Sequence, residues 1–203
     1  MSKKYELVVD DTITFWGWKL FRIRALISFG SVDAGDLGGY IYTEDNLSQK
    51  GDAWVSGDAK VWGDAKVSGN AKVSGNAEVS GDAEVLGNAE VSGNAKVSGD
   101  AEVWGNAEVW GNAEVSGDAE VWGNAEVSGD AKVSDFEDVI VFKNHWSSGR
   151  HFTYTKSNKM WRVGCFYGTG QELIDKAYRD SEKSGNFYKA YVEFIASLEG
   201  LGE

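Results

Sequence analysis

Apolar and polar residues alternate with a six-residue period through the middle of the chain. From Gly51 to Ser134 the sequence consists of fourteen uninterrupted copies of Gly-[Asp/Asn]-Ala-x-Val-x. Because strand side chains alternate between two faces, Ala and Val of each copy face one side and the residues flanking Val face the other. Val suits a pleated, half-buried surface, and Gly beside Asp or Asn suits a corner. The pattern predicts a β-solenoid with an Ala-Val core.

The period resembles the hexapeptide repeat of left-handed parallel β-helices, a family that includes acyltransferases. The resemblance implies three repeats for each triangular coil, so that fourteen repeats make a rod about 22 Å long at about 4.8 Å per rung. We therefore expect a mainly β protein in three parts. These are an N-terminal β cap at residues 1–50, a left-handed parallel β-helix at 51–140, and a C-terminal β-hairpin plus α-helical cap at 141–203.

Two helices are expected in the C-terminal part. Thr169-Gly170-Gln171-Glu172 fits a capping box, which predicts that a helix begins there. Apolar residues at helical spacing predict a second helix over residues 185–198.

Stacking residues 18 apart separates three faces of the rod, and one of them is strongly acidic. This third face has four aspartates and three glutamates against one lysine, a net charge of −6. After Ser68, its outward positions following Val are apolar, and an exposed apolar stripe usually marks an interaction surface. The predicted partner-binding residues are Leu86, Trp104, Trp122, Ile140, Glu84, Glu102, Glu120, Asp82, Asp100 and Asp118.

The stripe also has a simpler interpretation, in which the chain itself covers it. One of the C-terminal helices, or a second copy of the chain, would then lie over the tryptophans. The aspartate column would be a solvated surface, and a calcium site between Asp82 and Asp100 is the less favoured reading. We predict no metal and no cofactor.

A second candidate site follows the repeats. Residues 139–171 contain no Asp or Glu, and basic residues are interleaved there with aromatic ones. Charge and stacking together are typical of a nucleotide or single-stranded nucleic-acid site. The alternative, which we favour, is an aromatic core with cations docked on the acidic rod. The candidate ligand-binding residues are His145, Trp146, Arg150, His151, Lys156, Trp161 and Arg162.

Charge and composition restrict the classes of molecule that the protein is expected to bind. The net charge of −12 disfavours duplex DNA and anionic membranes, although a nucleotide remains possible. The single cysteine, Cys165, excludes an intrachain disulfide. The N-terminal residues lack the apolar core of a signal peptide, and no apolar run has the roughly 18 residues of a membrane span. We expect a cytoplasmic protein.

Catalysis is not expected. The acyltransferases that the repeat resembles use a histidine near their coils and a loop that leaves them, whereas residues 51–134 contain neither. Cys165 with His145 or His151 would make a nucleophile–base pair only if the fold brought them together. We predict no catalytic residue.

The flanks add a second resemblance. Residues 22–26, 35–41, 46–48 and 142–170, including Trp146-Ser147-Ser148-Gly149-Arg150, resemble a family of hexapeptide-repeat proteins from bacteriophages, prophages and gut bacteria. This resemblance implies a phage or mobile-element context, and we therefore predict a phage accessory or anti-host-defence factor in the host cytoplasm. The predicted function is a non-enzymatic binding or scaffold protein that contacts a host protein. The alternatives are a nucleotide or small-ligand binder, a self-assembling homo-oligomer and, less favoured, an acyltransferase.

Overall fold

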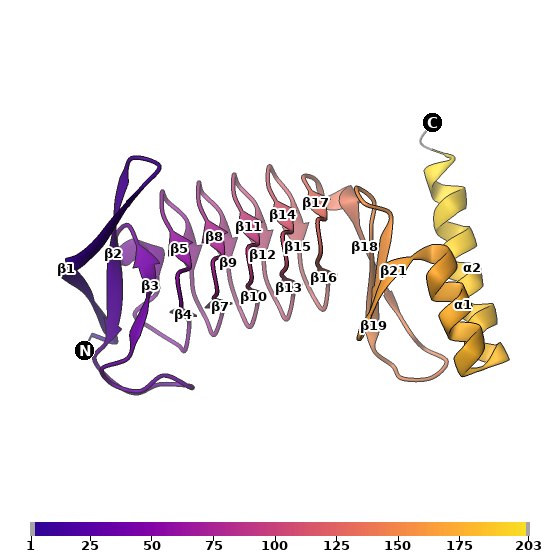
Figure 1. Cartoon of the computed structure of the whole chain (residues 1–203), viewed down its shortest axis with the longest axis horizontal. Helices are drawn as coiled ribbons and strands as arrows, with labels where there is room; N and C mark the ends of the chain where they lie inside the picture. Colours follow the sequence, from indigo (N-terminus) through magenta and orange to yellow (C-terminus); the bar gives the residue numbers. More distant parts are fainter. Residues whose placement is uncertain (1–2, 202–203) are drawn as a thin grey trace.

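The repeats form the parallel β-solenoid that their period predicts (Figure 1). The computed structural model describes residues 3–201. Each repeat contributes one two-residue strand, and strands 18 residues apart pair in parallel: Glu102 lies between Glu84 and Glu120. The strands are β4 (Trp54–Val55), β5 (Lys60–Val61), β6 (Lys66–Val67), β7 (Lys72–Val73), β8 (Glu78–Val79), β9 (Glu84–Val85), β10 (Glu90–Val91), β11 (Lys96–Val97), β12 (Glu102–Val103), β13 (Glu108–Val109), β14 (Glu114–Val115), β15 (Glu120–Val121), β16 (Glu126–Val127) and β17 (Lys132–Val133).

The strands form the three expected faces. The first sheet has the order β4-β7-β10-β13-β16, and the third has the order β6-β9-β12-β15. The second runs β5-β8-β11-β14-β17 and continues into the N-terminal cap. The Ala and Val side chains of all the repeats are buried and form one continuous core.

The corner glycines are needed for two reasons. Gly99, for example, has a φ of +72°, which side-chain-bearing residues rarely adopt. A Cβ atom on Gly99 would also lie 2.9 Å from the backbone nitrogen of Gly117 on the next rung. The close stacking of the rungs therefore depends on glycine at the corners.

Most backbone hydrogen bonds between rungs run in one direction, although the parallel pairing also returns one from the Val amide of each strand to the outward carbonyl of the preceding rung. The amide of each outward residue donates to a carbonyl on the following rung, as from Glu102 to Ala119 (2.9 Å) and from Trp104 to Val121 (3.0 Å). The first rung consequently presents mainly carbonyl acceptors, and the last presents mainly amide donors. Because unpaired backbone groups are costly when buried, the two ends need caps of opposite chemistry.

The N-terminal cap supplies donors. It comprises β1 (Tyr5–Phe15), β2 (Trp18–Ala25), β3 (Leu37–Ile41) and the short helix η1 (Glu44–Asn46). The amide of Tyr40 in β3 donates to the carbonyl of Ala59 at 2.9 Å, which continues the second sheet.

Two side chains complete this cap. Lys4 Nζ donates to the carbonyl of Ala53 on the first face (2.8 Å), and Asn46 Nδ2 donates to that of Ala65 on the third (2.8 Å). Each of the three faces thus receives a donor at its first rung.

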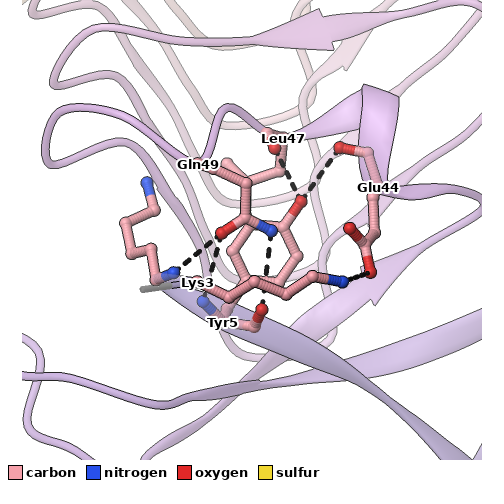
Figure 2. Close-up of polar contacts among 6 residues, drawn as sticks. Lys3, Tyr5, Glu44, Leu47 and Gln49 are labelled. Carbon is pink, nitrogen blue, oxygen red and sulfur yellow. Dashed lines mark hydrogen bonds and ion pairs between the residues drawn. The ribbon is translucent and has the colours of Figure 1, made fainter. Parts of the chain in front are cut away.

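The chain end that carries Lys4 is anchored by a buried tyrosine (Figure 2). The Tyr5 hydroxyl donates to the carbonyls of Leu47 (2.6 Å) and Glu44 (3.0 Å). Gln49 Oε1 accepts from the Lys4 amide at 2.8 Å, and Lys3 pairs with the Glu44 carboxylate. Burial raises the pKa of Tyr5, with Glu44 and Asp45 adding to the effect, so the hydroxyl stays protonated and remains a donor.

The C-terminal cap supplies acceptors. After β17 the chain forms the short helix η2 (Phe136–Asp138) and an antiparallel sheet of β18 (Val139–Lys143), β19 (His151–Thr155), β20 (Met160–Val163) and β21 (Phe166–Thr169). Thr153 Oγ1 accepts from the Glu126 amide of β16 at 3.0 Å, and Ser157 Oγ accepts from the Lys132 amide of β17 at 2.9 Å.

The other face of this sheet carries an aromatic core beneath two helices. Phe152, Tyr154 and Trp161 pack against α1 (Gly170–Asp180) and α2 (Glu182–Glu199). The expected capping box at Thr169 is present. The helices lie beyond the sheet at the far end of the molecule (Figure 1), so the expectation that one of them covers the tryptophan stripe is wrong. No helix in residues 3–201 combines the length and apolarity needed to cross a membrane.

The Lys4 contact predicts a pH dependence of stability. Burial lowers the pKa of Lys4 from 10.5 to about 8, partly opposed by Asp52. Between these pH values the unfolded chain binds more protons than the folded one. The stability contributed by Lys4 therefore increases from pH 8 to pH 10.5 and is lost once the pH drops below 8. Relative to Lys4→Met, the wild-type free energy of unfolding should rise between pH 8 and 10.5 by at most about 1.4 kcal/mol per pH unit. Parallel urea-denaturation profiles for the two proteins would contradict this.

Candidate partner-binding site

Two tryptophans of the third face form an exposed stack on the solenoid surface. Trp104 and Trp122 lie on successive rungs with ring centroids 5.6 Å apart and an interplanar angle of 13°. Trp104 is 38% exposed and Trp122 is 56% exposed, and Leu86 on the preceding rung is half-buried. The apolar stripe predicted from the repeat is therefore present over these three residues and reaches solvent.

Ile140, the fourth residue predicted for the stripe, lies elsewhere. The repeat would need glycine at position 135, and Asp135 stands there instead. The chain forms η2 rather than a corner, and Ile140 then pairs with Tyr154 and packs against the C-terminal aromatic core. The prediction for Ile140 is wrong, because the rung register ends before this residue.

The carboxylates of the third face form a column beside the tryptophans. Glu102, Glu120 and the corner residues Asp82, Asp100 and Asp118 are exposed, and Glu84 is half-buried. Lys66 Nζ pairs with Glu84 Oε1 at 3.4 Å, whereas Glu102 and Glu120 form no ion pair within residues 3–201. Adjacent like charges are unfavourable, so this column favours a partner that brings positive charge.

The corners of the other two faces carry side-chain hydrogen bonds that the aspartate column lacks. On the first and second faces, asparagines donate to one another along the stack, as from Asn88 to Asn106 (3.1 Å) and from Asn94 to Asn112 (3.1 Å). A carboxylate accepts hydrogen bonds but cannot donate them. Asp82 and Asp100 thus replace a hydrogen-bonded ladder with repulsion, so this column stabilises the fold less than the asparagine columns do.

The tryptophan stripe ends in a groove at the C-terminal end of the solenoid. Its volume is about 700 Å³. Trp122 and Glu120 line it on the solenoid side, and Phe136, Val141 and His151 line it on the side of the cap. Phe136 is 66% exposed. The stripe and the groove together form a continuous apolar surface beside the carboxylates, which we call the third-face site.

The residues expected for a nucleotide site are separated by the fold. Trp161 is buried, and Trp146 stacks on Phe187 with ring centroids 4.6 Å apart. Both rings belong to or pack against the C-terminal core, so they offer no open stacking platform.

Most cations of that group are also dispersed, although Arg150 and His151 line one small pocket together. Arg162 Nε pairs with Glu126 Oε2 at 3.0 Å and lies over the Trp110 ring, while Lys156 pairs with Glu137 at 3.7 Å. His145 packs against Trp146, and Arg150 is exposed. The favoured alternative, an aromatic core with Arg162 docked on the rod, agrees with these contacts.

Sequence reasoning missed three apolar residues of the groove, Phe136, Val139 and Val141. The signal available was the sequence Asp135-Phe136-Glu137-Asp138, in which Asp135 forms a capping box with Asp138. A capping box directly after a missing corner glycine indicates that the solenoid stops there and exposes its end.

Comparison with known proteins adds no relative for this site. No protein-family model matches the sequence, and no curated protein matches it. Across the described residues, no three His, Cys, Asp or Glu side chains gather in a metal-binding arrangement. The third-face site can form apolar contacts, aromatic stacking and attraction to positive charge.

Converting the aspartate column to asparagine should stabilise the fold. In Asp82→Asn/Asp100→Asn two new amide hydrogen bonds form along the stack and repulsion decreases, so the free energy of unfolding should rise by about 1–2 kcal/mol. Asp130→Asn is the matched control, because Asp130 already ends an asparagine ladder by accepting from Asn112 at 3.0 Å. Chemical denaturation measures the difference. An unchanged or lower stability of the double variant would rule out this explanation.

Proposed function

We propose that this chain is a non-enzymatic binding protein whose third-face site holds a cationic segment of a partner protein. The observation that carries the proposal is the exposed Trp104–Trp122 stack, which leads into the groove beside unpaired carboxylates. Apolar patches rimmed by polar residues mark interaction sites, and tryptophan is among the residues that contribute most to binding energy.

The carboxylates and the tryptophans of the third-face site together indicate the chemistry of the partner. Glu102 and Glu120 attract lysine or arginine, and the indole face of Trp122 accepts a cation by cation–π contact. The protein already contains such a contact, with the Arg162 guanidinium 4.5 Å from the ring centroid of Trp110. Resemblance of the flanks to phage hexapeptide-repeat proteins extends the proposal to a phage accessory factor in the host cytoplasm, with a host protein as the partner.

Panning of random linear peptides on the immobilised full chain tests the proposal. Wild type should enrich peptides that combine Lys or Arg with an aromatic residue. Trp104→Ser/Trp122→Ser should bind these peptides at least about 30-fold more weakly, as expected for loss of about 2 kcal/mol or more at a tryptophan hot spot.

Trp16→Asn is the matched control. Trp16 is 82% exposed at the tip of the β1–β2 hairpin and has a φ of +49°, which asparagine tolerates. This variant should keep the wild-type affinity. Equal capture of the same peptides by the double serine variant would refute the proposal. A dimer that dissociates only in the double serine variant, seen by sedimentation, would instead identify the stripe as an oligomer interface.

A further inference from the structure

The three faces of the solenoid end differently at the C-terminal cap. Backbone amides of β16 and β17 donate to the hydroxyl oxygens of Thr153 and Ser157. β15, the last strand of the third face, is an edge strand whose only sheet neighbour within residues 3–201 is β12. The cap therefore covers the donor ends of two faces and leaves the third open.

The backbone of β15 carries two unused donors. On the preceding rung, the amides of Glu102 and Trp104 donate to Ala119 and Val121. The corresponding amides of Glu120 and Trp122 have no acceptor within residues 3–201. A Cβ atom on the next corner glycine, Gly123, would meet no atom within 4 Å, which shows that no rung lies over this corner.

A second free edge borders the same space. β18 is the outer strand of its sheet and, in the described part of the chain, pairs only with β19. The amide of Asn144 donates to the carbonyl of Arg150, and the amide of Lys156 donates to that of Asp138. In an antiparallel ladder every second residue bonds to the neighbouring strand. The backbone groups of Val139 and Val141 therefore point away from β19. Val139 and Val141 both line the groove that Glu120 and Trp122 border.

From this geometry we infer that the partner segment binds as an extended strand, added in parallel to β15 as the next rung of the third face. This inference rests on the proposed function and specifies how the third-face site works. Carbonyls of the added strand accept from the amides of Glu120 and Trp122. Main-chain bonds of this kind supply affinity, and alternate side chains supply specificity.

The stacking rules of the solenoid define the side chains of the segment. A basic residue lies over Glu120, as Lys72 pairs with Glu90 on the first face at 3.0 Å. An aromatic residue two positions later lies over Trp122, as Trp122 stacks on Trp104. The residue between them faces Val139 and is small or apolar.

Charge argues for a foreign segment over a second copy of this chain. The exposed edge strand at the N-terminal end, β1, contains Glu6, Asp10 and Asp11. These carboxylates would oppose the carboxylates of the third face. A cationic segment of another protein removes that repulsion.

A titration of the full-length protein with two blocked peptides tests the inference. GNAKVW is a repeat with Lys and Trp at its outward positions, and WVKANG is the same composition reversed. Parallel addition depends on direction, so in amide-resolved NMR only GNAKVW should shift the Glu120 and Trp122 amides and slow their hydrogen exchange. Equal perturbation by both peptides would overturn the inference.

Variants at position 120 separate the backbone bond from the charge. Glu120→Gln removes the carboxylate and keeps the amide, and should weaken GNAKVW about 2- to 5-fold. Glu120→Pro also removes the donor at an edge that tolerates proline, and should weaken it about 3- to 10-fold further. Equal affinities of the two variants would overturn the inference. So would failure of GNAKVW to bind while panned cationic peptides still do, a result that leaves the proposed function standing.

Discussion

The direction of the hydrogen-bond ladder governs this structure. Most of the backbone hydrogen bonds of each rung are donated toward the C-terminal end and accepted from the N-terminal side. A solenoid of this kind has two chemically different ends, and each must be satisfied or left to solvent. Lys4 and Asn46 donate at one end, whereas Thr153 and Ser157 accept at the other. The two caps differ in architecture and in chemistry for this reason.

The candidate site lies where this capping is incomplete. The third face ends in the free edge of β15, and the exposed tryptophans and the carboxylate column lie on that same face. Asparagine ladders support the other corners, and the aspartates of the third face give up that support. Apolar exposure, uncompensated charge and unused donors all reduce stability, and their coincidence on one face fits a surface kept for a partner.

The repeat predicted the solenoid, because position within a six-residue period determines which way each side chain points. The resemblance to hexapeptide-repeat β-helices implied the three faces and, with them, the stacking of the tryptophans. The predicted register failed where the period stops. Ile140 was placed in the stripe by extending the register past Asp135, where the missing glycine ends the solenoid. The capping residues were not predictable, since Lys4 and Thr153 are recognised only by the carbonyl or amide that they meet in space. The helices were expected correctly, but their location depends on the aromatic core of the C-terminal sheet.

Amide hydrogen exchange of the free protein, resolved by residue, tests the central claim most directly. The account predicts slow exchange at Glu102 and Trp104 within the ladder, and at Glu126 and Lys132 beneath their side-chain caps. It predicts fast exchange at Glu120 and Trp122, whose amides face the groove. Protection of Glu120 and Trp122 equal to that of Glu126 and Lys132 would contradict the claim that the third face ends in an open edge.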